Sequence, residues 1–168
     1  MTRNNFFRIC IIAASLITST AHARWVTNTD DDLFSGGKQA MMIGEVSNQN
    51  GAIIFDCTKQ NMSVSYVEMD KTSEVTSDIP MDLILKVDAN SPVKLDATLT
   101  RRNVQAIQIS SNDDEQIKTL LKQIKDAKSK ILIGFQTKDG GNQISLSGNA
   151  SGSTVAVNSF VNACEITL

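Results

Sequence analysis

The chain has 168 residues, of which 41% are hydrophobic, 5% aromatic and 20% charged, and its formal net charge is -2. This length corresponds to one domain, and the composition differs from that of disordered, collagen-like and membrane proteins. Because Lys and Arg are not in excess, composition gives no support for a nucleic-acid-binding surface or a polybasic membrane patch.

The N-terminal segment has the three-part layout of an export signal. Arg3 and Arg8 supply positive charge, residues 9–17 are almost entirely apolar, and Ala21 and Ala23 are small residues at a suitable cleavage site. The apolar run is too short to span a bilayer, which needs about 20 residues. We expect cleavage after residue 23 and a periplasmic or secreted protein, with an uncleaved N-terminal anchor as the alternative.

Cleavage there would change which reactive side chains remain. It removes His22, the chain's single histidine, and also Cys10. The remaining cysteines, Cys57 and Cys164, form an even pair in a chain bound for an oxidising compartment. We therefore expect a disulfide that closes a loop of about a hundred residues. An intermolecular bridge and two free thiols are the alternatives.

Residues 24–168 are expected to form a single domain that begins with a β-meander. Apolar residues alternate along 40–46, 51–57 and 62–69, and turn residues separate these segments. Asn50-Gly51 favours a tight hairpin between the first two segments. In the third segment Met62, Val64, Tyr66 and Glu68 share one face.

The second part of the domain is expected to mix strands with two helices. Further strands are predicted over 82–87, 93–100, 104–109, 130–137 and 143–147. An amphipathic helix is predicted over about 112–128, and a short C-terminal helix over about 153–164, with Ser153 or Thr154 as its N-cap. The predicted fold class is therefore α+β, mainly β, as an antiparallel sheet or sandwich-like domain.

The layout also resembles that of known exported proteins. Trp25 lies just after the leader and precedes an Asp-rich turn at Asp30–Asp32, a hairpin strand ends at Cys57, and the last helix ends at Cys164. This arrangement resembles the periplasmic, type VI secretion-associated TagO/VasI proteins and the invasion-associated locus B proteins. The resemblance implies an accessory of the envelope or of a secretion machine, or a virulence-associated factor. It brings no assigned catalytic residues with it.

Most catalytic arrangements are excluded by residue type. Without histidine, residues 24–168 can assemble neither a Ser-His-Asp nor a Cys-His site, nor a histidine-based metal site. Ser35 and Lys38 match a Ser-x-x-Lys pattern, but Gly36 and Gly37 between them disfavour the helix that such a motif needs. We therefore expect no catalytic residues and no cofactor.

Acidic residues leave two further alternatives. Residues 28–32 begin like a calcium loop, but Leu33 replaces the expected glycine and Gln39 the expected glutamate, so no metal site is predicted. An acid/base pair of carboxylates stays open, because its spacing is spatial rather than sequential. A concave cluster of two or more acidic residues in the fold would favour such an enzyme.

Six residues are candidates for contacts with a partner. Trp25 and Phe34 bracket an acidic loop that includes Asp30 and Asp32, and exposed aromatic residues are frequent anchors at interfaces. Arg101 and Arg102 could hold a carboxylate or phosphate group through their forked donors. The alternatives are that Trp25 packs in the core and that the two arginines form a solvated surface pair.

These observations predict a non-enzymatic exported protein that binds another protein in the envelope or outside the cell. We expect no nucleic-acid partner and no membrane insertion after signal cleavage. The alternatives are an inhibitor or immunity protein of the same compartment, a small carboxylate-dependent envelope hydrolase, and a carrier of a small ligand.

Overall fold

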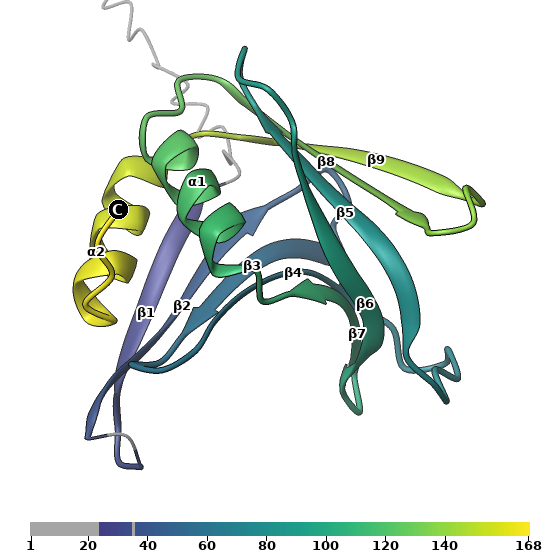
Figure 1. Ribbon diagram of the computed structural model, residues 1–168, viewed down its shortest axis with the longest axis horizontal. Coiled ribbons are helices and arrows are strands. Elements are labelled where there is room, and N and C mark those ends of the chain that lie inside the picture. Colours follow the sequence, from purple (N-terminus) through teal and green to yellow (C-terminus); the bar gives the residue numbers. More distant parts are fainter. Residues whose placement is uncertain (1–23, 35) are drawn as a thin grey trace, which may run out of the picture.

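The computed structural model describes residues 24–34 and 36–168. The predicted export signal, with Cys10 and His22, lies outside the described residues. Within them the chain forms eleven helices and strands (Figure 1). In order these are β1 (Trp25–Asp32), β2 (Gly37–Glu45), β3 (Gly51–Cys57), β4 (Met62–Met69), β5 (Ile79–Val87), β6 (Val93–Asn103), β7 (Ala106–Ser111), α1 (Asp114–Lys125), β8 (Lys130–Thr137), β9 (Gln143–Asn149) and α2 (Ser153–Ala163).

All the strands of the described residues belong to one antiparallel sheet, in the order β1-β2-β3-β4-β7-β6-β5-β8-β9. The predicted class, α+β and mainly β, is confirmed. The architecture is a single curled sheet rather than two facing sheets. Side chains alternate between a core face, which points into the curl, and an outer face.

The first strand corrects one prediction. Residues 28–32 were expected to form an acidic loop, but they continue β1, in which Asp30 pairs with Gln39 of β2. Alternation of apolar and polar residues does not predict this strand, because both of its faces are polar. It is extended because it is an edge strand, where polar side chains remain in water while the backbone bonds to β2. Thr27 on its core face donates to the Ala156 carbonyl at 2.7 Å.

The sheet curls until its two ends meet at one corner. The Ser47 N–H, just after β2, donates to the Ser147 carbonyl of β9 at 2.7 Å, and the Trp25 N–H of β1 donates to the Ser151 carbonyl at 2.9 Å. The Trp25 indole Nε1 also donates to the Asn149 carbonyl at 2.8 Å. The two ends of the sheet are therefore joined by hydrogen bonds at this corner, and elsewhere the curled sheet stays open as an incomplete barrel.

Both helices lie on the core face of the sheet, toward the left in Figure 1. The expected stripe of α1 is fully buried, namely Ile117, Leu120, Leu121 and Ile124. Asp113 caps this helix, because its side chain accepts from the Gln116 N–H at 3.1 Å. From α2, Phe160 meets Phe55 of β3 edge-on, with ring centroids 6.3 Å apart. The helices therefore cover one part of the core face and leave the rest open.

The start of α2 differs from expectation. Neither Ser153 nor Thr154 caps the helix, because the N-cap is Gly152, whose φ of 81° lies in the left-handed region. A Cβ at Gly152 would lie 2.9 Å from the Trp25 carbonyl oxygen, so the backbones approach closely there. The hydroxyl of Thr154 instead donates to the Lys125 carbonyl at 2.7 Å and joins the two helices.

The predicted disulfide between Cys57 and Cys164 is confirmed. It joins the end of β3 to the end of α2 across 107 residues, with the Cα atoms 6.2 Å apart. Both cysteines are buried in the main core. Such a bond is compatible with an oxidising compartment. Among the residues that the structure describes, no helix is long and apolar enough to span a membrane.

Candidate functional site

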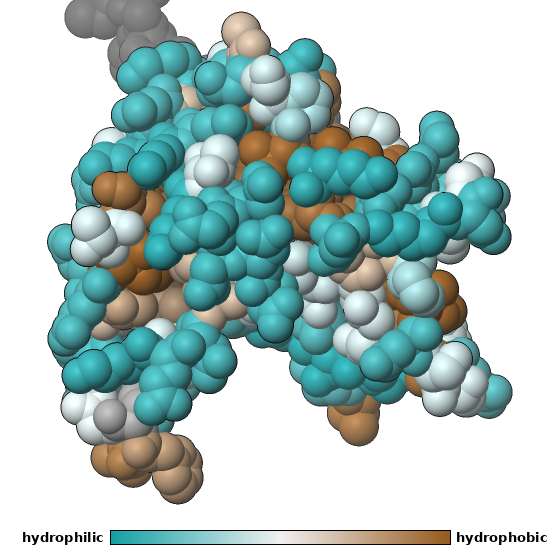
Figure 2. Space-filling view, viewed as in Figure 1, coloured by the Kyte–Doolittle hydropathy of each residue, from teal (hydrophilic) through white to brown (hydrophobic). Residues whose placement is uncertain are grey.

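The hairpin between β1 and β2 ends in two exposed apolar side chains. Leu33 is 90% exposed and Phe34 is fully exposed. The backbone of the turn is nevertheless held, because the Phe34 N–H donates to Asp32 Oδ1 at 3.0 Å and the Gly36 N–H donates to the Asp32 carbonyl at 3.0 Å. In Figure 2 these side chains form the brown and tan tip at lower left. The hairpin thus presents an apolar tip on a hydrogen-bonded turn.

The stem below this tip is acidic. Asp30, Asp31 and Asp32 follow one another at the end of β1, whereas Lys38 is the only cation on the facing part of β2. Lys38 Nζ lies 3.2 Å from Asp31 Oδ1, and both side chains are largely exposed. An exposed pair of this kind adds little stability. The stem keeps a net negative charge next to the apolar tip.

Trp25 does not share this surface, which corrects its proposed role as an exposed anchor. It is only 3% exposed and packs against Phe55 with ring centroids 6.3 Å apart. A Cβ added at Gly44 would lie 2.5 Å from its ring, so β2 approaches the indole closely. Of the two aromatic candidates, only Phe34 is exposed.

Arg101 is engaged by backbone carbonyls rather than left to clamp an anion. Its Nη1 donates to the Asp70 carbonyl at 3.0 Å and to the Asn103 carbonyl at 3.3 Å, and its Nη2 donates to the Ser73 carbonyl. Asp70 and Ser73 belong to the connection from β4 to β5. This side chain therefore fastens that connection to β6.

Arg102 points to the outer face, where its guanidinium binds Asp56. Its Nη2 lies 3.1 Å from Asp56 Oδ1 and 2.9 Å from Oδ2, and its Nη1 donates to Gln108 Oε1 at 3.0 Å. A register shift between Arg101 and Asn103 accompanies this arrangement. The two arginines thus do not form one solvated pair, because each has its own partners within the fold.

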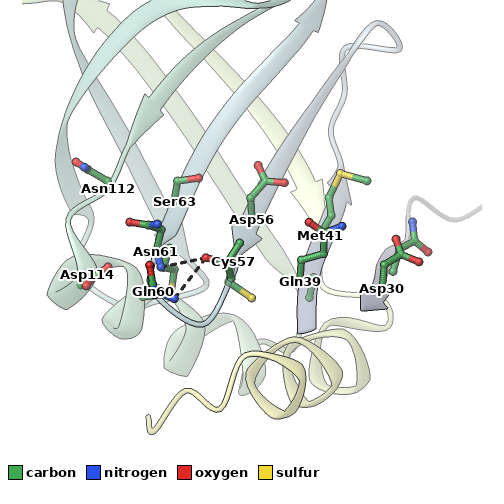
Figure 3. A pocket seen from close by; sticks show the side chains of 14 residues that line it. Asp30, Gln39, Met41, Asp56, Cys57, Gln60, Asn61, Ser63, Asn112 and Asp114 are labelled. Atoms are coloured by element: carbon green, nitrogen blue, oxygen red, sulfur yellow. Dashed lines mark hydrogen bonds between the residues drawn. The ribbon is translucent and has the colours of Figure 1, made fainter. Parts of the chain in front are cut away.

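A polar hollow of about 610 Å³ lies on the outer face of the first strands (Figure 3). The strand registers place Asn28, Met41, Asp56 and Ser63 in one row across β1 to β4, and Asn112 follows beyond the end of β7. Apart from Met41 this row is polar. The hollow could accept a polar chain or a sugar, and it also contains the carboxylates on which an enzyme would depend.

Three aspartates line this hollow, but they are spread along it. Figure 3 shows Asp30 and Asp114 at opposite ends, with Asp56 between them. Two strand spacings and an offset of two residues put the Cα atoms of Asp30 and Asp56 about 12 Å apart. In glycosidases two carboxyl groups face each other about 5–9.5 Å apart, whereas other side chains stand between the three aspartates in Figure 3. In addition, Asp56 is ion-paired with Arg102. The hollow therefore lacks an adjacent pair of free carboxylates.

A second cavity, of about 230 Å³, lies on the core face beyond the helices. Its walls come from β4 to β9 and are mostly apolar, formed by Tyr66, Met81, Leu99, Ile109, Phe135 and Ile144. The rings of Tyr66 and Phe135 are stacked, with centroids 4.7 Å apart. One carboxylate, that of Glu68, also lines the cavity.

Polar groups meet at one wall of this cavity. The Tyr66 hydroxyl donates to Glu68 Oε2 at 2.9 Å and accepts from Asn48 Nδ2 at 2.9 Å. Burial, together with the hydrogen bond to Glu68, raises the pKa of Tyr66 to about 12. The alternation of β4 had placed Tyr66 and Glu68 on one face without indicating a site. The available signal was a carboxylate at the end of an apolar strand face.

In the part of the chain that the structure describes, no group of three or more His, Cys, Asp or Glu side chains is placed to bind a metal ion. No protein family matches this chain, and neither does any curated protein or any solved structure. The resemblance to the TagO/VasI and invasion-associated locus B proteins therefore stays a prediction.

Proposed function

We propose that this protein is a non-enzymatic binding protein of the periplasm or the extracellular space, and that it contacts a protein partner through the β1–β2 hairpin. The observation that carries the proposal is the exposure of Leu33 and Phe34 at the tip. Aromatic side chains supply much of the binding energy at protein interfaces when they enter a pocket of the partner. Covering two such side chains removes apolar surface from water, which favours association.

The charge of the hairpin supports a partner surface of complementary charge. Asp30 and Asp31 lie beside the apolar tip, and a single lysine faces them. The complementary surface is an apolar pocket rimmed by Lys or Arg. Such charge complementarity mainly increases the association rate and rejects acidic partners.

The proposed compartment rests on two observations. The Cys57–Cys164 bond is stable where thiols are oxidised, and residues 1–23 have the composition of an export signal. A role as an accessory of the envelope or of a secretion machine is what the predicted resemblance to TagO/VasI proteins implies.

A second role within the same class is favoured by the shape of the hairpin. A narrow hairpin with an apolar tip fits an inhibitor or immunity protein that inserts into the active-site cleft of its partner. A carboxylate-dependent hydrolase has less support, because the aspartates of the outer hollow are spread out and Asp56 is bound to Arg102.

The test is a comparative purification from the envelope fraction of the producing organism. The protein and its Phe34→Ser variant are tagged, purified in the oxidised form and analysed for stoichiometric companions by mass spectrometry. Val104→Ser is the matched control, because Val104 is 82% exposed in the turn between β6 and β7 and lies outside the hairpin.

We expect one companion that co-purifies with the parent protein and with Val104→Ser but is lost with Phe34→Ser. A companion retained by all three proteins would refute the hairpin as the binding element. A protein that purifies alone and hydrolyses peptidoglycan or glycans would refute the binding class and support the hydrolase.

A further inference from the structure

The cavity on the core face has no role in the proposed hairpin function, yet it has the form of a ligand site. At about 230 Å³ it exceeds an engineered cavity of about 150 Å³ that admits benzene, and it falls just below the usual range for ligand sites. Figure 1 shows the β8–β9 hairpin extending on the side away from the helices, so neither helix fills this end of the sheet. The cavity therefore suits a compact ligand of one ring and a short chain.

The composition of the walls indicates the body of that ligand. The stacked rings of Tyr66 and Phe135 form one wall, and Leu99, Ile109 and Ile144 contribute aliphatic surface. Such walls favour an aromatic or branched aliphatic group over a sugar or a phosphate. Polar side chains also line the cavity, namely Gln108, Thr137 and Asn142, but among its lining residues Glu68 alone carries a charge.

Glu68 is the feature that specifies the charge of the ligand. Its half-buried carboxylate accepts from Tyr66, but among the described residues no lysine or arginine lies within ion-pair distance of it. Arg101 lies on β6, which is separated from Glu68 by β7, and it donates to three backbone carbonyls instead. A carboxylate partly removed from water gains most from a cation that also donates hydrogen bonds.

We propose that this cavity binds a small arylalkylammonium ion, with its ring against the apolar walls and its ammonium group paired with Glu68. The ammonium group can donate to the carboxylate oxygen atoms while Tyr66 keeps its own hydrogen bond to Glu68. The ligand site is separate from the hairpin, which lies on β1 and β2.

The experiment compares three probes of nearly equal shape by isothermal titration calorimetry. They are 2-phenylethylammonium, the neutral 2-phenylethanol and the anionic 3-phenylpropanoate. We expect the ammonium ion to bind about 10- to 100-fold more tightly than the alcohol, and the carboxylate to bind most weakly because Glu68 repels it.

Variants then locate the binding. Glu68→Gln keeps a hydrogen-bond acceptor for Tyr66 and removes the charge, so it should abolish the preference for ammonium over alcohol. Glu45→Gln is the matched control, because Glu45 is exposed on the outer face of β2, and it should bind all three probes as the parent does. Ile144→Trp adds bulk at a half-exposed position of the rim and should weaken the binding of both ammonium and alcohol.

Circular dichroism establishes that each variant is folded before titration. Equal affinity of the parent for ammonium and alcohol would overturn the assignment of Glu68. Absence of ammonium binding at about 10 mM, or ammonium binding that Ile144→Trp leaves unchanged, would overturn the site itself. None of these results bears on the hairpin, because Phe34 is intact in every variant.

Discussion

Replacing Cys57 and Cys164 together by alanine should lower the free energy of unfolding by about 4–5 kcal/mol. The bond spans 107 residues, and in the chain-entropy treatment a loop of about that length restricts the unfolded chain by roughly this amount. Since each kcal/mol shifts the melting temperature of a domain of this size by about 2–4 °C, the midpoint should fall by about 8–20 °C.

The assay is urea and thermal unfolding of the oxidised parent and of the double variant, both in a Cys10→Ser background. Trp25 is the only tryptophan of the chain and lies in the core, so its emission reports the loss of tertiary structure. Reducing agent should destabilise the parent and leave the double variant unchanged.

A difference below about 1 kcal/mol between parent and double variant would contradict the expected contribution of the disulfide to stability. It would mean that the unfolded chain is already restricted without the bond, or that the bond does not form in the purified protein. A destabilisation confined to α2, with Trp25 emission preserved until a later transition, would instead show that unfolding is not a single step.

Two further predictions concern single residues. Tyr66 is the only tyrosine of the chain, so a titration of phenolate absorbance against pH should give its pKa near 12 rather than near 10. Because the folded state favours the neutral phenol, the free energy of unfolding should be full below pH 10 and should decline as the pH rises toward 12. Glu68→Gln should lower that midpoint, and a midpoint near 10 in the parent would contradict the burial of this wall. Gly44→Ala would put a Cβ 2.5 Å from the Trp25 ring and should cost about 1–3 kcal/mol in urea unfolding; unchanged stability and emission would contradict the close packing.

Local sequence patterns predicted most of the secondary structure because each element carries its own periodicity. The alternation over 62–69 and 130–137 coincides with β4 and β8, and the stripe from Ile117 to Ile124 is the buried face of α1. By contrast β1 was missed, because Asn28 to Asp32 is polar on both faces and is extended only through its pairing with β2.

The order of the strands could not be predicted from the same patterns. Alternation indicates which face of a strand is buried, but it does not indicate which strand lies beside it. The chain leaves β4 and returns beside it only as β7, after β5 and β6 have formed. The connection that makes this possible is held by Arg101, whose carbonyl partners carry no sequence signal.

The candidate sites also differ in how far the sequence could predict them, because some are local in the chain and others are assembled from distant residues. Phe34 and the neighbouring aspartates were identified because they are local to one turn, and the structure exposes Phe34. The pairing of Arg102 with Asp56 joins residues 46 positions apart, and the cavity beside Glu68 is assembled from six strands. Features of this kind depend on the curl of the whole sheet.

The measurement that tests the proposed function most directly is photocross-linking from the tip of the hairpin. A benzophenone amino acid is introduced at position 34, and in a matched protein at position 104, in cells of the producing organism under oxidising conditions. We expect one defined covalent adduct from position 34 and none from position 104. Adducts at both positions, or at neither while a partner still co-purifies, would contradict binding through the β1–β2 hairpin.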